Sequence, residues 1–340
     1  MTVDFVKLLA SKGTLEIYGD GIILGKQKYY QIRSRNDVGK SFGFWLIMLI
    51  GVFKMKKLSV LLLMIGILLC TATSVFADNA QNHYDKGKQY FKQEKFDMAI
   101  TEFGNAIKIN PKYADAYIYR GIAYRRTGQY DAAIRDYSSA ITINPNSELA
   151  YQNRGISYVH KRQYSNAVSD FTRVLQINPN HEDAYYNRGT VYMNQKKYDL
   201  AISDLSHAIA LNPNDASYYN NRGTSYLNKE HEINAGNLQN GQYDTAIADF
   251  TRAIQIKPDH ANAYYNRGHC YYHQGKYDSA IAECSRSISI NPSIAGAYNI
   301  RGMAYKAKGQ YEKATADYKK AISLDPGNTT YTNNLKKIHS

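Results

Sequence analysis

Apolar and aromatic residues recur along residues 80–328 at helical spacing, in blocks separated by short polar breaks. Within a unit of 34 residues they fall at positions 4, 11, 17, 21, 24 and 28, and the break lies near positions 14–16. Steps of three, four and seven residues place side chains on one face of an α-helix. The pattern therefore predicts two antiparallel helices in every unit.

A glycine at position 8 of each unit sets the period. Successive glycines are 34 residues apart, except for one gap of 45 that indicates an insertion of 11 residues. A fixed period between about 20 and 50 residues is typical of a solenoid, in which each unit buries the apolar face of its neighbour. We therefore expect seven repeats, at residues 80–113, 114–147, 148–181, 182–215, 216–260, 261–294 and 295–328.

Other positions are as regular as the glycine. All seven prolines of the chain fall at position 32, alanine fills position 20 and tyrosine fills position 11 in every unit. With large side chains at positions 4 and 24, this pattern resembles the tetratricopeptide repeat family over residues 80–328. The resemblance implies an all-α fold, a right-handed α-solenoid of seven 34-residue helix-turn-helix repeats, capped by a C-terminal segment at residues 329–340.

An Arg-Gly dipeptide at positions 7 and 8 departs from the resemblance, because the family usually has leucine at position 7. Position 7 is basic and position 23 is acidic in every repeat. In a hairpin that turns near position 15 these two positions lie about level. We expect a ladder of ion pairs between helices, within a repeat or across to its neighbour, since charged side chains are seldom buried unless paired. The alternative is a row of arginines offered to an acidic ligand. The pairs are Lys86 with Glu102, Arg120 with Asp136, Arg154 with Asp170, Arg188 with Asp204, Arg222 with Asp249, Arg267 with Glu283 and Arg301 with Asp317.

Residues 55–77 have the features of a bacterial secretory signal peptide. A basic start is followed by a long apolar run and by a small-residue cleavage site that ends at Ala77. A lipoprotein interpretation through Cys70 is weakened by Leu69, since a small residue is expected before a lipidated cysteine. Residues 58–77 are also long enough to span a bilayer, so an uncleaved membrane anchor is the alternative.

We interpret residues 1–54 as an upstream or misassigned extension, with translation starting at Met55. Residues 14–32 alternate like short strands with glycine turns. The fragment Gly-Lys-Ser at 39–41 is not taken as a phosphate-binding loop, because Ser34 stands where the first glycine is required and no apolar strand precedes it.

Composition and charge limit the classes of function. A hydrophobic content of 44% with only seven prolines indicates an ordered chain, and most of the 32 tyrosines fall at packing positions of the repeats. Ten of the 42 basic and four of the 29 acidic residues lie in residues 1–77, which leaves a net charge of +7 after them. Nucleic-acid binding needs basic residues clustered on one face, and this surplus is spread along the array, so we expect no nucleic-acid partner.

The resemblance also implies where a ligand would bind. In this family it lies in the concave groove lined by the first helix of each repeat, chiefly at positions 2, 5, 9, 12 and 13. Here the early groove is basic, the middle carries amides and the late groove is aromatic with histidines, which suits an extended peptide or a partner protein. The clamp that relatives use for chaperone C-termini, with Lys at 5 and Asn at 9 of one repeat, is not reproduced. The groove residues are Tyr84, Lys88, Phe91, Lys92, Arg125, Arg126, His160, Tyr186, Asn194, Asn220, Asn228, Tyr265, His269, Tyr272, His273 and Lys306.

Repeat six contains the sharpest cluster of metal-binding residue types, His-Cys-Tyr-Tyr-His at residues 269–273. His269 and His273 lie on one helix face, but Cys270 should point away and no carboxylate completes a set of three or four ligands. We interpret the two histidines as polar groove residues and predict no metal and no cofactor. Cys270 and Cys284 are expected to be buried thiols, because their positions are not level across the hairpin and a disulfide would be strained.

The sequence thus predicts a non-enzymatic protein–protein interaction scaffold of the bacterial cell envelope. It would be periplasmic or secreted, and membrane-anchored if residues 58–77 are not cleaved. No nucleophile–base arrangement recurs, so no catalytic residue is assigned. The alternatives are a membrane-tethered assembly factor with the same repeats, and a metal-binding or enzymatic site in repeat six. The insertion at residues 230–240 lengthens the turn of repeat five, as a tolerated surface insertion or as a flap at the groove edge.

The signal-peptide pattern of residues 55–77 gives the first testable prediction. If translation starts at Met55 and cleavage follows Ala77, the exported protein begins at Asp78. Intact-mass measurement of the protein isolated from its native cell checks this. Peptides from residues 1–54 in that cell would contradict the assigned start, and an uncleaved segment 58–77 would favour the membrane anchor.

Overall fold

The structure, a computed structural model, comprises two compact units, Met1–Ser74 and Val75–Ser340. Both the predicted signal segment at 55–77 and the Gly-Lys-Ser fragment at 39–41 lie outside the described residues. Within the described part of the chain, no helix is long and apolar enough to cross a membrane. The described residues are 16–18, 21–23, 29–31, 79–233 and 241–338.

The first unit contains a small antiparallel sheet. Strands β1 (Glu16–Tyr18), β2 (Gly21–Ile23) and β3 (Tyr29–Gln31) pair in the order β1-β2-β3, with Ile17 opposite Ile22 and Ile22 opposite Tyr30. The strands that alternation over residues 14–32 predicts are therefore present.

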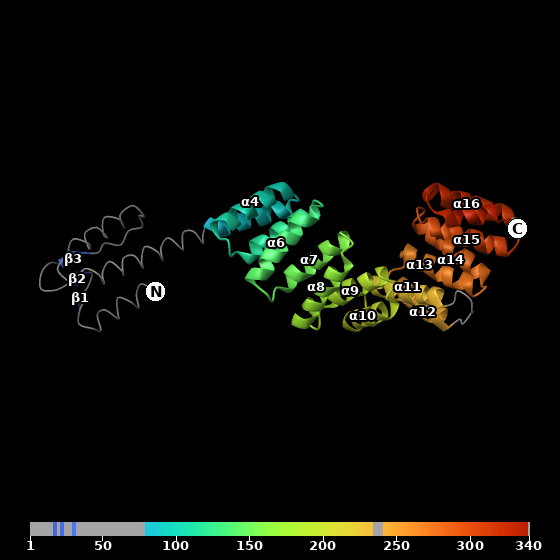
Figure 1. The fold of residues 1–340 in the computed structure, drawn as a ribbon, viewed down its shortest axis with the longest axis horizontal. Helices are drawn as coiled ribbons and strands as arrows, with labels where there is room; N and C mark the ends of the chain where they lie inside the picture. Colours follow the sequence, from blue (N-terminus) through green and yellow to red (C-terminus); the bar gives the residue numbers. More distant parts are fainter. Residues whose placement is uncertain (1–15, 19–20, 24–28, 32–78, 234–240, 339–340) are drawn as a thin grey trace. The chain divides into compact units, whose positions relative to one another are not determined.

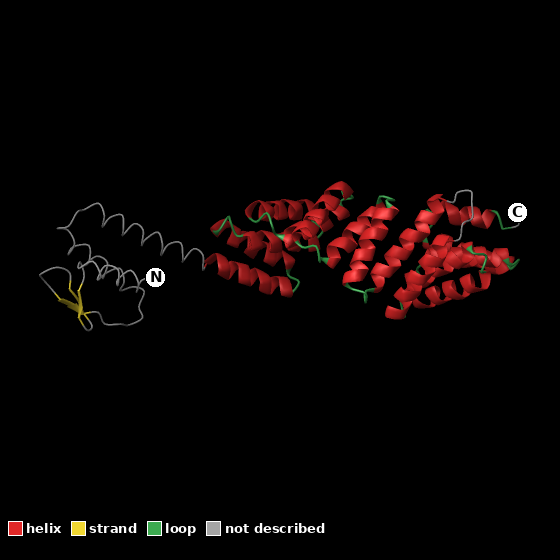
Figure 2. Ribbon diagram, turned by 90° about the horizontal axis from the view of Figure 1, so that it is seen from below, coloured by secondary structure: helices red, strands yellow, loops and turns green. Residues whose placement is uncertain are grey.

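The second unit is an array of helix pairs, and each pair is one repeat (Figures 1 and 2). Residues 79–92 form the first helix of the array. Each later helix packs on the one before it. This confirms the all-α solenoid of seven repeats. The helices that follow are α4 (Phe96–Ile109), α5 (Ala114–Arg126), α6 (Tyr130–Ile143), α7 (Glu148–His160), α8 (Tyr164–Ile177), α9 (Glu182–Asn194), α10 (Tyr198–Leu211), α11 (Ala216–Ile233), α12 (Gly241–Ile256), α13 (Ala261–His273), α14 (Tyr277–Ile290), α15 (Ala295–Ala307), α16 (Tyr311–Leu324) and α17 (Thr329–Lys336).

The turn inside a repeat depends on a left-handed residue at position 15. Gly128, Gly275 and Gly309 occupy this conformation with φ of 73–76°. In three other repeats a non-glycine residue at position 15 adopts the same conformation, which is sterically less favourable for it than for glycine. These residues are Glu94, Arg162 and Lys196, with φ of 57–59°. Repeat five differs from the expected turn.

In repeat five the insertion extends the first helix. Helix α11 runs on to Ile233, and α12 begins at Gly241. Residues 230–233 therefore continue a helix rather than lengthen the turn. The rest of the insertion, 234–240, lies outside the described residues.

The second helix of a repeat ends before the proline at position 32. Asn144 follows α6 with φ of −128° and ψ of 93°, and Pro145 comes next. A residue before proline is pushed out of the helical region, so the helix cannot continue. The next helix, α7, begins at Glu148, and the Oγ of its N-cap residue, Ser147, accepts a hydrogen bond from the Ala150 amide.

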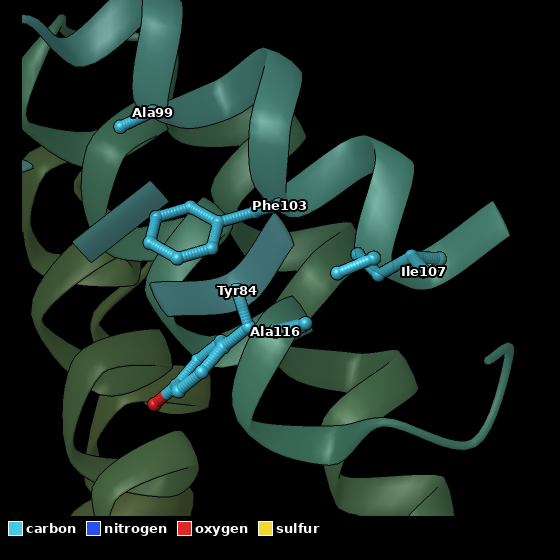
Figure 3. Packing of buried hydrophobic residues seen from close by; sticks show 6 residues of the cluster. Tyr84, Ala99, Phe103, Ile107 and Ala116 are labelled. Carbon is cyan, nitrogen blue, oxygen red and sulfur yellow. The ribbon is translucent and has the colours of Figure 1, made fainter. Parts of the chain in front are cut away.

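The glycine at position 8 lets the two helices of a repeat come into close contact. A Cβ atom on Gly155 would lie 2.7 Å from the ring of Phe171, which is fully buried at position 24. The ring therefore fills the space where any other residue would have its side chain. Figure 3 shows the core of the first repeat, where Phe103 on α4 packs near Tyr84 of the first helix, with ring centroids 5.8 Å apart.

The ladder of ion pairs is present, and it runs within each repeat. Arg188 binds Asp204 through two hydrogen bonds, from Nε to Oδ2 at 2.7 Å and from Nη2 to Oδ1 at 2.8 Å. Only 17% of the arginine side chain and 7% of the aspartate side chain are exposed. Hydrogen bonding to Asp204 raises the pKa of Arg188, so the arginine stays charged. The other arginines at position 7 pair with their carboxylates in the same two-bond manner.

From repeat three onward, each ladder arginine also reaches the preceding repeat, through a hydroxyl at position 25. Arg188 Nη1 donates to Thr172 Oγ1 at 2.9 Å, and Arg222 Nη1 donates to Ser206 Oγ at 3.1 Å. The contact recurs for Arg154, Arg267 and Arg301 with Ser138, Thr251 and Ser285. One guanidinium therefore ties the two helices of its own repeat together and ties that repeat to its neighbour.

Tyrosines surround the guanidinium groups. The Arg188 guanidinium lies 5.8 Å from the ring centroid of Tyr185 and 6.0 Å from that of Tyr192, which are three residues before and four residues after it. The same arrangement holds for Arg154 with its two tyrosines. Aromatic faces attract a cation and shield it from water, which strengthens the ion pair.

The ladder gives a testable prediction on stability. Replacing Arg188 by leucine leaves Asp204 buried without a cation and Thr172 without its donor, so the free energy of unfolding should fall by roughly 1–3 kcal/mol. Thermal or chemical denaturation of the purified protein measures the change.

The double variant Arg188→Leu with Asp204→Asn removes both charges and should recover part of that loss. Arg126→Leu, at an exposed position outside the ladder, serves as the control and should change stability little. An Arg188→Leu variant as stable as the wild type would exclude the structural role of the ladder.

Candidate functional site

The first helices of successive repeats approach one another more closely than the second helices do. In the described ranges, contacts between alternate helices are made by α5 with α7, α7 with α9, α9 with α11, α11 with α13 and α13 with α15. An array whose first helices crowd together curves toward them. The face carried by the first helices is therefore the inner one, as the sequence resemblance implies.

At the early end of this face, exposed cations lie beside an aromatic floor. Lys92 and Arg126 are exposed, and Lys88 is half-buried with its Nζ 5.4 Å from the ring centroid of Tyr84. Tyr84 itself is only 7% exposed and belongs to the core cluster, so it supports the surface rather than presenting a ring to a ligand. Phe91, half-buried, meets the ring of a neighbouring tyrosine edge-on.

Arg125 is the exception among the early cations. It is half-buried, and its Nη2 donates to Asn153 Oδ1 of the next repeat at 3.3 Å. Arg125 is therefore engaged within the array, and the accessible positive charge of this end comes from Lys88, Lys92 and Arg126.

The middle of the face is a chain of amides and hydroxyls that bond to one another across repeats. Asn221 Nδ2 donates to the Tyr186 hydroxyl at 3.3 Å. Asn266 Nδ2 donates to Asn220 Oδ1 and to Thr224 Oγ1, both at 3.2 Å. These bonds link position 6 of one repeat to positions 5 and 9 of the repeat before it.

Sequence reasoning missed the asparagines at position 6, although the recurring Asn-Arg-Gly triplet marks them. Their role needs the offset between neighbouring helices, which the sequence does not give. Other predicted groove residues in this stretch remain open to solvent. His160 and Asn194 are exposed, and Asn228 is half-buried. The position-6 asparagines are Asn153, Asn187, Asn221 and Asn266.

The late end is aromatic and crowded. Tyr265 packs against Gly296, where a Cβ atom would lie 2.8 Å from its hydroxyl, and burial raises the pKa of Tyr265 to about 12. Tyr272 is half-buried and meets the ring of His273 edge-on at 5.3 Å. His269 and His273 bring their Nε2 atoms to 3.2 Å of each other. Lys306, last of the predicted groove residues, donates to the backbone carbonyl of Lys337.

The opposite face carries the ladder and a second set of basic groups, at position 26. The Arg252 guanidinium lies 6.0 Å from the ring centroid of Tyr219, and the His207 ring stacks on Tyr185 at 4.9 Å. A shallow depression of about 370 Å³ lies here, lined by Arg154 and Asp170 with their neighbours. Arg154 and Asp170 bind each other there, so this arginine already has its carboxylate partner inside the protein.

Chemically, the inner face can offer cations at one end, hydrogen-bonding amides in the middle and stacked rings at the other end. Among the described residues, no group of three or more His, Cys, Asp or Glu side chains is placed to hold a metal ion.

Comparison with known families agrees with the geometry. Models described as "Tetratricopeptide repeat" match residues 114–147, 149–181, 182–215, 205–248, 261–294 and 295–328. A model described as "TPR repeat" matches residues 87–128 and 238–275. Together these matches extend over most of the helical array. A search of curated proteins found no match.

Solved structures of repeat proteins share the fold. A tetratricopeptide repeat protein from Parabacteroides merdae has 22% identity and a TM-score of 0.58, over 77% of this chain and 100% of that one. The C-terminal part of a repeat protein from Cytophaga hutchinsonii has 19% identity and a TM-score of 0.56, over 74% and 99% of the two chains. PilF of Pseudomonas aeruginosa has 18% identity and a TM-score of 0.55, over 66% and 97%. At these identities the likeness concerns the fold alone.

The two cysteines of repeat six lie beneath the face and are separate thiols. Cys270 and Cys284 are both fully buried and both free. Burial raises the pKa of the Cys284 thiol to about 12 and holds the pKa of Cys270 well above its usual range. The expected buried thiols are confirmed, and no disulfide joins them.

Alkylation should therefore report on the opening of repeat six. At pH 8 we expect iodoacetamide to modify Cys270 and Cys284 at least about a hundredfold more slowly in the native protein than in denaturant, since the thiolate is the reacting form. Mass spectrometry of the two peptides measures the rates. Ser279→Cys places a thiol at an exposed position of α14 and should react fast in both conditions. Equal native rates for Cys284 and for this introduced thiol would contradict the burial.

Proposed function

Because the chain belongs to the tetratricopeptide repeat family, we propose that it is a non-enzymatic scaffold of the bacterial cell envelope that binds an extended segment of a partner protein along its inner face. The observation that carries this proposal is the contrast between the two ends of that face. Exposed cations gather at one end, half-buried rings gather at the other, and hydrogen-bonded amides join them.

The polar middle supports an extended ligand. An extended peptide exposes a backbone N–H and C=O at every residue, and carboxamide and hydroxyl side chains can pair with both. Asn194 is exposed and Asn228 is half-buried, so their carboxamide groups can reach the backbone of a bound peptide. Pairing with the backbone tolerates many sequences, which leaves the choice of partner to the two ends.

The ends would provide direction. Lys92 and Arg126 favour an acidic portion of the ligand at the early repeats, since exposed charges steer association. Tyr272 offers ring area at the late repeats, and desolvated aromatic side chains supply much of the energy at protein interfaces. We therefore expect the acidic part of the partner segment near repeats one and two and its apolar part near repeat six.

Location in the envelope is supported by the signal-peptide pattern of residues 55–77 alone. An uncleaved segment 58–77 would instead give a membrane-tethered assembly factor that uses the same inner face. The two alternatives differ in one property: a tethered protein stays in the membrane after alkaline washing, and a cleaved one is released.

Site-specific crosslinking in the native cell tests the proposed face and direction. A photoreactive amino acid at Lys92 or at Tyr272 should capture the same partner, because one extended segment would contact both ends. Mass spectrometry of the adducts should find a peptide rich in Asp and Glu at Lys92 and an apolar peptide at Tyr272.

Lys320 provides the matched control, since it is exposed on α16, a second helix. The reactive group at Lys320 should give no adduct with that partner. Capture from Lys320 and not from Lys92 or Tyr272 would rule out the inner face as the binding surface.

A further inference from the structure

His269 and His273, one turn apart on α13, bring their Nε2 atoms to 3.2 Å of each other. Their ring centroids are 4.9 Å apart and the rings are tilted by 54°. Two imidazole nitrogens at this separation must share a proton or another cation, because two bare lone pairs repel. In a neutral pair, one Nε2 carries a proton and donates it to the other.

Neighbouring rings hold this convergence. His273 is nearly parallel to Tyr243 of α12, with an interplanar angle of 5° and centroids 5.5 Å apart. His269 is nearly parallel to Tyr265, at 14° and 6.1 Å. Tyr272 meets His273 edge-on. Both imidazoles are therefore oriented by packing before any ligand arrives, which lowers the entropy lost on binding.

The separation also matches the geometry of a chelate. Zinc binds histidine nitrogen at about 2.0–2.1 Å, so an ion that shares two nitrogens 3.2 Å apart subtends an angle of about 100–105°. That angle is close to tetrahedral, the geometry that zinc prefers. A metal ion can therefore take the place of the shared proton with no large movement of either ring.

We propose that His269 and His273 form a two-nitrogen site for one divalent transition-metal ion of the Zn²⁺, Cu²⁺ or Ni²⁺ class. Imidazole suits these ions, whereas Mg²⁺ and Ca²⁺ require oxygen ligands. Cys270 does not take part, because it is fully buried in the cluster with Leu227 and Phe250. Among the described residues the protein supplies two nitrogens, which leaves further coordination positions for water or an outer ligand.

This two-nitrogen site differs from the metal site with three or four protein ligands that the sequence argues against in repeat six. A structural zinc site needs three or four protein ligands, and the described residues bring no such group together. Two nitrogens make a weaker, open site that exchanges its metal and its outer ligands. Its existence does not depend on a partner in the groove, so the metal alone tests it.

The test is a titration of the purified full-length protein, stripped of metal by EDTA, with Zn²⁺ followed by calorimetry. We expect one ion bound at this site, with affinity at least about tenfold lower in His269→Gln and in His273→Gln, because either change removes the intramolecular second bond. Zn²⁺ should also raise the melting temperature of the wild type and not that of the two variants.

His160→Gln is the matched control, since it removes an exposed histidine of the same face and should leave the affinity within about twofold of the wild type. Thermal melts of the metal-free variants confirm that they fold. Zn²⁺ binding that is equal in His269→Gln, His273→Gln and wild type would overturn the proposal, as would the lack of saturable binding up to about 1 mM.

Discussion

The structure depends on a buried charge that cannot be left unpaired. Arg188 lies between two tyrosine rings and is mostly covered, so it must satisfy its guanidinium inside the protein. It does so with Asp204 across the hairpin and with Thr172 of the preceding repeat. Because the fork of the guanidinium is rigid, these bonds fix the distance between the two helices and the offset between the two repeats. A leucine at this position would fill the same volume, but it would fix neither the distance between the helices nor the offset between the repeats.

The adjacent glycine sets the geometry that the ion pair requires. Without a Cβ atom, Gly155 lets the ring of Phe171 lie directly against the first helix, which brings Arg154 and Asp170 to 2.8 Å. The two residues of the recurring Arg-Gly dipeptide thus act together. The glycine lets the two helices pack closely, and the arginine joins them through its ion pair. Departures from it mark the ends of the array. Lys86 replaces arginine in repeat one, which has no preceding repeat, and Leu335 of α17 packs against Tyr318 where an eighth arginine would stand.

The sequence was sufficient to predict whatever repeats with the period of 34. Helix pairs, the proline stop after Asn144 and the pairing of Arg188 with Asp204 all follow from counting positions. The sequence was not sufficient to predict contacts between neighbouring repeats, because the offset between two repeats depends on how they pack. The hydroxyl that Arg188 reaches at Thr172 and the bond from Asn266 to Asn220 belong to that class. The same limit applies to Tyr84 and Tyr265, which the family resemblance places on the groove and which packing covers.

The inner face divides its residues between two tasks. Amides in its middle, such as Asn221 and Asn266, already bond across repeats, so a ligand there would compete with bonds that hold the array together. Lys92 and Arg126 at its early end are exposed, and the residues at the two ends differ from one repeat to the next. Lys92 stands at position 13 in repeat one, and His273 stands at the same position in repeat six. A repeat can vary these positions freely because the ladder on the other face carries the packing. Selectivity for a partner is therefore expected to lie at the ends of the face, and the regular positions serve to hold those ends at a fixed separation.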